Sequence, residues 1–511
     1  MRGLTKVQIP NGIIGVKARY TKQIIYDYKD NPLIEALPKI LDKENIIDEL
    51  SNYPIFNEEE RELEGGLRYH ITQRLFQYFQ PLNRHVELYN KINLMIRQGY
   101  ITRNPTKKEF ANVLNTGYKA IMNNNIEINK NVNFKNSALG LTLFGISGAG
   151  KTTAVDKILS TLPQVIVHSK YKRKQLMIYQ IVWLKVEIPN DGSIKSFCLS
   201  VFSQVDGMVG TDYFKKYGSG YVSANVMLTV IVQIFRNLNC GILIIDEVQN
   251  LHVAHSGGAE KLINFFLLMV NTINVPILLI GTPLAIHLLQ GQFRVARRNS
   301  SLGSILWDRL ENDEEFELLL EGLWQYQWTK KTVELNKKMI DLLYYESQGI
   351  IDVVIKIFVM AQQKAINTGK EEIDEILLRS IVKEELQLIK PMLDALKSGD
   401  INKISKYSDI DMPKIRNYDD FTINLNYKNK EKNDTLVEFN ELLDVNVNNA
   451  EKERKVEIEN RTKRKNKNNN YNTMDLRFIV KEAKEKEISI YDNLKWHRII
   501  KSYADFQEEI L

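Results

Sequence analysis

Short β-branched runs alternate with longer stretches of helical periodicity between residue 139 and about residue 320. Each run is almost continuously apolar, which is typical of strands buried on both faces of a parallel sheet. The alternation therefore predicts βαβ units, with helices covering a parallel sheet. The expected strands are residues 141–144, 164–167, 181–186, 242–245 and 276–280.

The chain before this core has the pattern of a mostly helical region. Residues 1–29 predict an irregular arm, and residues 31–38 (NPLIEALP) predict a turn and a short helix bounded by prolines. From residue 58 to residue 100 apolar residues recur near helical spacing, which predicts packed amphipathic helices.

The chain after the core first returns to helical periodicity. One helix is expected after Gly349 and another over residues 373–388, which together form a small helical lid. The region from residue 401 to residue 470 is increasingly dominated by Asn, Lys and Glu, so it is predicted to be a largely disordered linker. Apolar residues return near the end and predict a short terminal element. The expected parts of the chain are a mostly helical N-terminal region (1–130), the nucleotide-binding core (131–325), the helical lid (326–400), the linker (401–470) and the C-terminal tail (471–511).

Composition narrows the class of protein. The chain has 511 residues, 44% apolar and 26% charged, which indicates a soluble globular protein. No apolar run approaches the roughly 20 residues of a membrane helix, and no secretory signal is visible, so we expect a cytoplasmic protein without membrane contact. Cys198 and Cys240 are too few for a disulfide framework or a zinc site and are expected to be buried.

A phosphate-binding motif lies between the first core strand and the helix expected over residues 153–159. Residues 145–152 (GISGAGKT) fit the pattern G-x-x-x-x-G-K-[ST], in which backbone N–H groups and a helix N-terminus surround phosphate oxygens. Lys151 would reach the β and γ phosphates, and Thr152 would offer its hydroxyl to Mg²⁺. The expected cofactors are ATP and Mg²⁺. The expected nucleotide-binding residues are Gly145, Ser147, Gly148, Ala149, Gly150, Lys151, Thr152 and Thr153.

Two further strands end in polar residues. The strand 242–245 ends in Asp246 and Glu247, which are predicted to hold Mg²⁺ and to polarise the attacking water, respectively. The strand 276–280 is followed by Gly281 and Thr282. Thr282 could sense the γ-phosphate or hold the water, or it could cap the next helix through its side chain.

Residues 293–299 (FRVARRN) contain three arginines. Hydrolysis needs a positive charge on the γ-phosphate, and a neighbouring subunit can supply it. Arg297 and Arg298 are the candidates for this catalytic role, and a solvated helix face is the alternative.

The chain resembles the TnsC/TniB group of AAA+ ATPases, which regulate Tns-type bacterial transposons. Within this group it is most similar to TnsC. The resemblance covers about residues 20–390. It is carried by residues 31–38, 148–154, 180–186 (QIVWLKV), 191–195 (DGSIK), 246–251 (DEVQNL) and 293–298. One departure is Gly349-Ile350-Ile351-Asp352, because many AAA+ lids carry an arginine soon after this glycine.

The resemblance implies a fold and a function. It implies an AAA+ P-loop core with a helical lid, ATP hydrolysis, and assembly as a homo-oligomeric ring or filament around double-stranded target DNA. It also implies a link between a TnsD-type target selector, met by the N-terminal region, and the TnsA and TnsB transposase subunits, met by the C-terminal tail.

DNA binding is expected to follow the phosphate backbone without sequence specificity. No base-reading motif is visible, and 69 basic against 63 acidic residues is a modest excess. Each candidate contact could also be an ordinary solvated charge. The candidates are Lys172, Arg173, Lys195, Lys215 and Lys216.

Two other functions share the nucleotide motifs. An AAA+ loader or sensor related to replication initiators would use the same chemistry without recombinase partners. A P-loop small-molecule kinase fits less well, because Asp246 and Glu247 at the end of a buried strand suit activation of water.

Overall fold

The computed structural model describes residues 5–107, 139–218, 222–253, 258–290, 302–407 and 410. They all belong to one compact unit that spans residues 1–414. Within these residues no helix is long and apolar enough to cross a membrane.

The nucleotide-binding core is built on a five-stranded sheet in which all neighbouring strands are parallel. Its spatial order is β6-β7-β8-β3-β9. The strands are β3 (Gly140–Gly145), β6 (Trp183–Glu187), β7 (Ile242–Asp246), β8 (Ile277–Gly281) and β9 (Ser304–Trp307). Four of the five lie where the sequence predicts strands, and β9 was not predicted.

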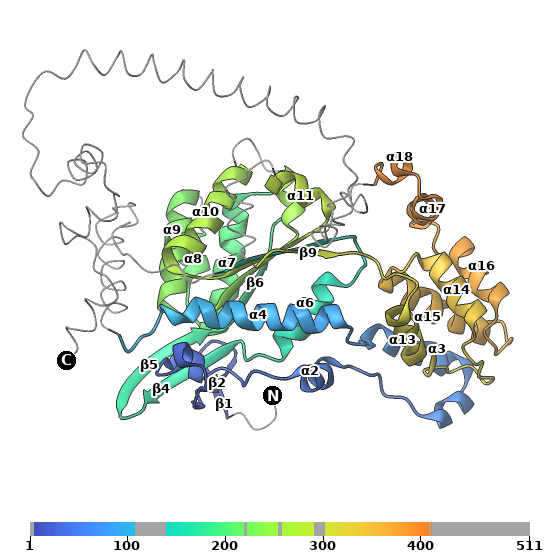
Figure 1. The fold of residues 1–511 in the computed structure, drawn as a ribbon, viewed down its shortest axis with the longest axis horizontal. Helices are drawn as coiled ribbons and strands as arrows, with labels where there is room; N and C mark the ends of the chain where they lie inside the picture. Colours follow the sequence, from blue (N-terminus) through green and yellow to red (C-terminus); the bar gives the residue numbers. More distant parts are fainter. Residues whose placement is uncertain are drawn as a thin grey trace, which may run out of the picture. The chain divides into compact units, whose positions relative to one another are not determined.

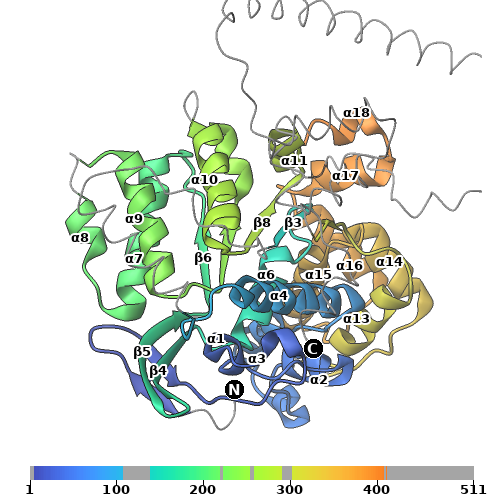
Figure 2. The ribbon, with the colours of Figure 1, turned by 60° about the vertical axis from the view of Figure 1, so that its left-hand side comes forward.

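Helices cover both faces of this sheet (Figures 1 and 2). Side chains alternate along each strand, so Ile242 and Ile244 of β7 enter one core, and Leu243 and Ile245 enter the other. The first face packs against α4 (Asn83–Ile101) and α6 (Lys151–Ser160). The second packs against α7 (Ile194–Val209), α9 (Ala224–Asn237) and α10 (Gly258–Ile273).

A second, smaller sheet corrects two expectations. Its order is β1-β2-β4-β5, with β1 (Lys6–Gln8), β2 (Ile14–Lys17), β4 (Val165–Tyr171) and β5 (Lys174–Ile181). The N-terminal arm is therefore not irregular, since two of its segments are strands. The predicted strand at 164–167 belongs here rather than in the parallel sheet, because the turn at Lys172 folds the chain back and pairs β4 with β5.

Helices occupy the predicted N-terminal and lid regions. The N-terminal set is η1 (Tyr26–Tyr28), α1 (Pro32–Glu35), α2 (Lys43–Leu50), η2 (Glu58–Glu62), α3 (Gly65–Ile71) and η3 (Thr72–Gln77). The C-terminal set is α13 (Glu314–Trp324), α14 (Lys337–Ser347), α15 (Ile351–Asn367), α16 (Glu375–Glu384), α17 (Lys390–Ser398) and α18 (Ile401–Ile404). The helical set also extends beyond the predicted lid, with α13 before residue 326 and α18 after residue 400. Helices α8 (Tyr213–Tyr217), η4 (Val248–Val253) and α11 (Pro283–Gln290) complete the described elements.

The N-terminal region and the lid share a core with the first sheet face. Leu88 of α4, Val155 of α6 and Phe358 of α15 belong to the same hydrophobic cluster. Arg68 of α3 also forms an ion pair of 2.6 Å with Glu371, and the Arg68 side chain is only 3% exposed. The lid is therefore joined to the N-terminal region by packing and by charge.

Candidate nucleotide-binding site

The phosphate-binding loop joins β3 to α6, as the motif predicts. Gly145 ends the strand, Ser147 to Gly150 form the turn, and Lys151 begins the helix. Gly148 and Gly150 have φ angles of +80° and +88°, a region that side-chain-bearing residues rarely adopt. These two glycines allow the loop to close above the N-terminus of α6, where its N–H groups can face phosphate.

Lys151 lies folded against the loop. Its ammonium group donates to the carbonyl oxygens of Gly145 at 2.7 Å and Ile146 at 2.8 Å, and the residue is only 8% exposed. A buried cation held by neutral carbonyls can move its hydrogen bonds to an arriving phosphate at little cost, since charge-assisted bonds are the stronger ones.

The groups predicted to hold Mg²⁺ are in contact. The hydroxyl of Thr152 donates to Oδ2 of Asp246 at 3.0 Å, although the two residues are far apart in sequence. Lys185 of β6 lies 3.5 Å from the same oxygen and pairs with Asp156 of α6 at 2.7 Å. A hydroxyl and a carboxylate are oxygen ligands that suit Mg²⁺. No cluster of three His, Cys, Asp or Glu side chains that could hold a metal ion occurs in the described part of the chain.

Glu247 has an unusual backbone and environment. Its φ angle is +57°, and its N–H donates to Oδ1 of Asp246 at 2.9 Å. Such strain is typical of functional sites. Burial, and then the nearby charges of Asp246 and Glu187, raise the pKa of the Glu247 carboxyl above its usual range. A raised pKa favours a group that accepts a proton during reaction.

Thr282 follows β8, next to the phosphate loop. It is 8% exposed, and its hydroxyl has no hydrogen-bond partner among the residues that the structure describes. The alternative in which this side chain caps α11 is therefore wrong. An unpaired buried hydroxyl is costly, and a phosphate oxygen or a water in the adjacent pocket would satisfy it.

These residues line one pocket of about 430 Å³. The sequence predicted its phosphate end, which contains Ser147, Gly148, Gly150, Lys151, Thr152, Thr153, Asp246, Glu247 and Thr282. Gly145 and Ala149 belong to the loop but do not line the pocket. They lie on the side of the loop that faces β9.

The other end of the pocket was not predicted. It is lined by aromatic and aliphatic side chains from η3, the segment after it, α4, α13 and α15, namely Phe76, Tyr78, Phe79, His85, Leu319, Ile351 and Ile355. Burial and the neighbouring Arg84 lower the pKa of His85 to about 3, so its ring is neutral at physiological pH. An apolar, uncharged end of this kind suits a planar base such as adenine.

The lid touches the phosphate loop at the position where the sequence has an acid. The backbone N–H of Asp352 donates to the carbonyl of Gly148 at 3.2 Å, and Asp352 lines the pocket. Its carboxylate pairs with Lys356 at 2.6 Å. The lid therefore brings an aspartate to the pocket, near the position where many AAA+ lids carry an arginine.

Trp307 supports the loop from behind and was also not predicted. Its indole N–H donates to the carbonyl of Ala149 at 2.8 Å, and the Arg84 guanidinium lies 4.5 Å from the ring centroid. β9 thereby fixes the outer side of the loop. The short run SILW offers too weak a periodic signal to reveal this strand from sequence.

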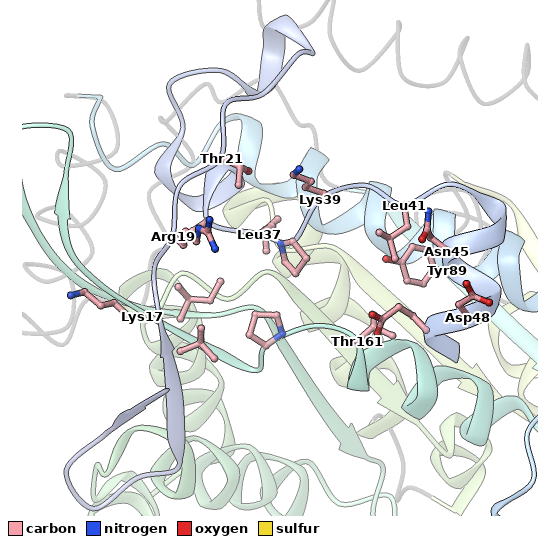
Figure 3. A pocket seen from close by; sticks show the side chains of 16 residues that line it. Lys17, Arg19, Thr21, Leu37, Lys39, Leu41, Asn45, Asp48, Tyr89 and Thr161 are labelled. Carbon is pink, nitrogen blue, oxygen red and sulfur yellow. The ribbon is translucent and has the colours of Figure 1, made fainter. Parts of the chain in front are cut away.

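A larger cavity, of about 780 Å³, lies elsewhere (Figure 3). It lies between the N-terminal arm, the α1–α2 segment and the end of α6, with Lys17 and Arg19 toward one end and Asp48 toward the other. None of the predicted nucleotide-binding residues lines it, so size alone does not identify the site.

The predicted DNA contacts fall into two groups. Lys172 and Arg173 form the tip of the β4–β5 hairpin, where Lys172 pairs with Asp30 at 2.6 Å. Lys195 lies in the first turn of α7, and Lys215 and Lys216 lie on α8, which packs against α7 through aromatic contacts. Arg297, Arg298, most of the predicted linker 401–470 and all of the predicted tail 471–511 lie outside the described residues.

A family profile agrees with this arrangement. Residues 135–289 match the family profile described as an AAA domain. The parallel sheet, the phosphate loop and the acidic strand end together define an AAA P-loop fold.

Several solved structures are similar to the chain at low identity. The Walker-type ATPase of Pyrococcus abyssi is 15% identical, with a TM-score of 0.34 and coverage of 58% of this chain and 76% of that one. The Aeropyrum pernix Orc1 protein in complex with DNA is 15% identical, with a TM-score of 0.34 and coverage of 56% of this chain and 66% of that one. Drosophila ORC bound to DNA is 12% identical, with a TM-score of 0.33 and coverage of 58% and 66%. No curated protein matches the chain.

The raised pKa of Glu247 predicts a pH-dependent effect on stability. The folded protein holds this proton more tightly than the unfolded chain, so the ionised carboxylate destabilises the fold at high pH, and the penalty disappears as pH falls through the raised pKa toward about 4.5. Glu247→Gln should therefore unfold at a higher temperature than the wild type at pH 8, without nucleotide. The difference should shrink as pH falls. Calorimetry across pH tests this, and a pH-independent difference would contradict it.

Proposed function

We propose that the protein hydrolyses ATP with Mg²⁺ and uses its ATP state to regulate DNA transposition. The observation that supports the ATPase most strongly is the convergence of Lys151, Asp246, Glu247 and Thr282 on one pocket, where the Thr282 hydroxyl has no partner in the described part of the chain. The transposition role rests on the resemblance to TnsC.

The side chains have distinct roles in the proposed reaction. The loop N–H groups and Lys151 bind the β and γ phosphates, and Thr152 and Asp246 would hold Mg²⁺, which neutralises phosphate charge. Glu247 accepts a proton from water as the water oxygen bonds to the γ-phosphorus. The bond between that phosphorus and the β–γ bridging oxygen breaks, which yields ADP and phosphate. Thr282 offers its hydroxyl to the γ-phosphate or to the water.

The protein would act as a homo-oligomeric ring or filament, with Arg297 and Arg298 supplying charge to the neighbouring subunit's site. Removing an arginine of this kind typically lowers the rate about 10³- to 10⁵-fold. A double variant, Arg297→Ala with Arg298→Ala, should therefore be inactive alone. Mixed with Lys151→Ala, which still presents its arginines, it should regain part of its ATPase rate. No recovery in the mixture would argue for a structural role.

DNA is proposed to bind along its backbone, through Lys195, Lys215 and Lys216 and through the hairpin residues Lys172 and Arg173. Charge reversal at Lys195 or Lys216 should weaken binding to all sequences equally and spare DNA-independent ATPase activity. Each neutralised phosphate should contribute about 0.9 to the slope of log affinity against log salt. Fluorescence anisotropy with two unrelated duplexes measures this, with Lys338→Glu on α14 as the exposed control. A flat salt response or a strong sequence preference would contradict the proposal.

The partners are proposed to be a TnsD-type selector and the TnsA and TnsB transposase subunits, with residues 471–511 as the transposase-binding tail. The experiment is a pull-down with the proteins encoded beside this gene. Nucleotide-dependent capture of transposase subunits supports the regulator. Capture of a helicase or of replication proteins instead would favour the loader.

A further inference from the structure

The amide side chain of Gln249 connects two elements of the site that the motifs leave separate. Gln249 lies in η4, two residues after Glu247, and lines the nucleotide pocket. Its Nε2 donates to Oε2 of Glu247, and its Oε1 accepts from the backbone N–H of Thr282 at 3.1 Å. One side chain therefore spans from the end of β8 to the carboxylate after β7.

The end of β8 lies close to this amide. A Cβ added to Gly281 would lie 3.1 Å from Oε1 of Gln249, so a side chain at this position would crowd the amide. Both polar atoms of the amide are then used inside the site, one on each strand end. This arrangement fixes the direction in which the N–H₂ group points, since the acceptor is held by Thr282.

Without the hydrogen bond from Gln249, the charges around Glu247 would favour a different position of its carboxylate. Asp246 precedes it, and Glu187 is a further negative charge in its surroundings. Repulsion from each of them exceeds the attraction of Lys151 and favours rotation of the Glu247 carboxylate toward solvent. A hydrogen bond from a neutral donor opposes this rotation, and bonds to a charged group are among the stronger ones.

We propose that Gln249 is a positioning residue that holds Glu247 in the place from which it takes the proton of the attacking water. It binds one carboxylate oxygen, Oε2, and leaves Oε1 for the water. Because Oε1 of Gln249 accepts from the Thr282 N–H, the Glu247 carboxylate is held at a fixed position relative to the end of β8. That strand end would face the γ-phosphate. This inference rests on the proposed ATPase function.

The first test is the Gln249→Met variant, which keeps the length of the side chain and removes both hydrogen bonds. The expected kcat for ATP hydrolysis falls about 10- to 100-fold, as for loss of one hydrogen bond to a charged group. KM, and the affinity for a fluorescent ATP analogue, should stay within about twofold, because Gln249 is not assigned to phosphate binding. Retained affinity also shows that the variant folds.

Two further variants separate the roles of the amide. Gln249→Glu keeps an oxygen for Thr282 and loses the donor to Glu247, so it should be at least as slow as Gln249→Met. Asn250→Leu is the matched control, because Asn250 lies in the same turn but binds the carbonyl of Ile188. Its kcat should stay near the wild-type value. A loss as large as that of Gln249→Met would show a general effect of the turn and overturn the inference.

The decisive measurement is a double-mutant cycle with Glu247→Gln. If Gln249 acts through Glu247, adding Gln249→Met should leave the small residual rate of Glu247→Gln unchanged. The same fold-loss in both backgrounds would overturn the inference. If the unaltered protein hydrolyses no ATP, with or without DNA, the proposed ATPase fails and this inference fails with it. A normal wild-type rate with an unaffected Gln249→Met variant refutes this inference alone.

Discussion

Replacing Lys151 by alanine is expected to lower ATP affinity by at least about 100-fold. Lys151 is the loop's cationic side chain, and each charge-assisted hydrogen bond it would make to a phosphate is worth about 1.5–3 kcal/mol. Loss of bonds to both the β and γ phosphates therefore exceeds 100-fold, since a factor of ten is about 1.4 kcal/mol. Titration with a fluorescent ATP analogue and Mg²⁺ measures the change.

The fold should survive this substitution. In the nucleotide-free protein the Lys151 ammonium donates to the neutral carbonyl oxygens of Gly145 and Ile146, and water can take its place there. Lys338→Ala, an exposed lysine on α14, is the matched control and should bind ATP normally. Wild-type affinity in Lys151→Ala would refute the assignment of residues 145–152 as the phosphate-binding loop.

Replacing Glu247 by glutamine is expected to separate binding from hydrolysis. The amide has nearly the shape of the carboxylate and can still accept the bond from Gln249, so ATP and Mg²⁺ affinity should stay close to wild type. The amide cannot take a proton from water, and loss of a general base typically costs about 10²- to 10⁴-fold in rate. Phosphate release under steady-state conditions measures the rate.

The consequence for regulation follows from slower hydrolysis. If the ATP state is the active one, Glu247→Gln should keep its assembly on DNA longer, and transposition should become less selective. Hydrolysis at the wild-type rate would show that Glu247 is a solvated acid, and the mechanism would need another base.

The phosphate end of the site could be predicted from sequence because most of its residues lie in two short segments, each of which follows a strand. The loop from Gly145 to Thr152 and the pair Asp246 and Glu247 each follow a buried apolar run, and the carboxyl ends of neighbouring parallel strands meet at one edge. The local signal and the tertiary arrangement therefore coincide.

The rest of the site depends on tertiary contacts that no local pattern encodes. Phe76 and His85 reach the pocket from the N-terminal region, and Trp307 supports the phosphate loop from a four-residue strand. Gln249 is visible in DEVQNL, yet its role depends on the left-handed backbone of Glu247 and on Thr282. The strands of the arm escaped prediction because they are only three and four residues long and mostly polar or small.

Electron microscopy of the protein with duplex DNA and a nonhydrolysable ATP analogue tests the proposed ATP-dependent assembly most directly. We expect rings or filaments that surround DNA of any sequence, that require the nucleotide, and that are absent for Lys151→Ala. Particles of a single subunit, or assemblies that form equally well without nucleotide, would contradict it.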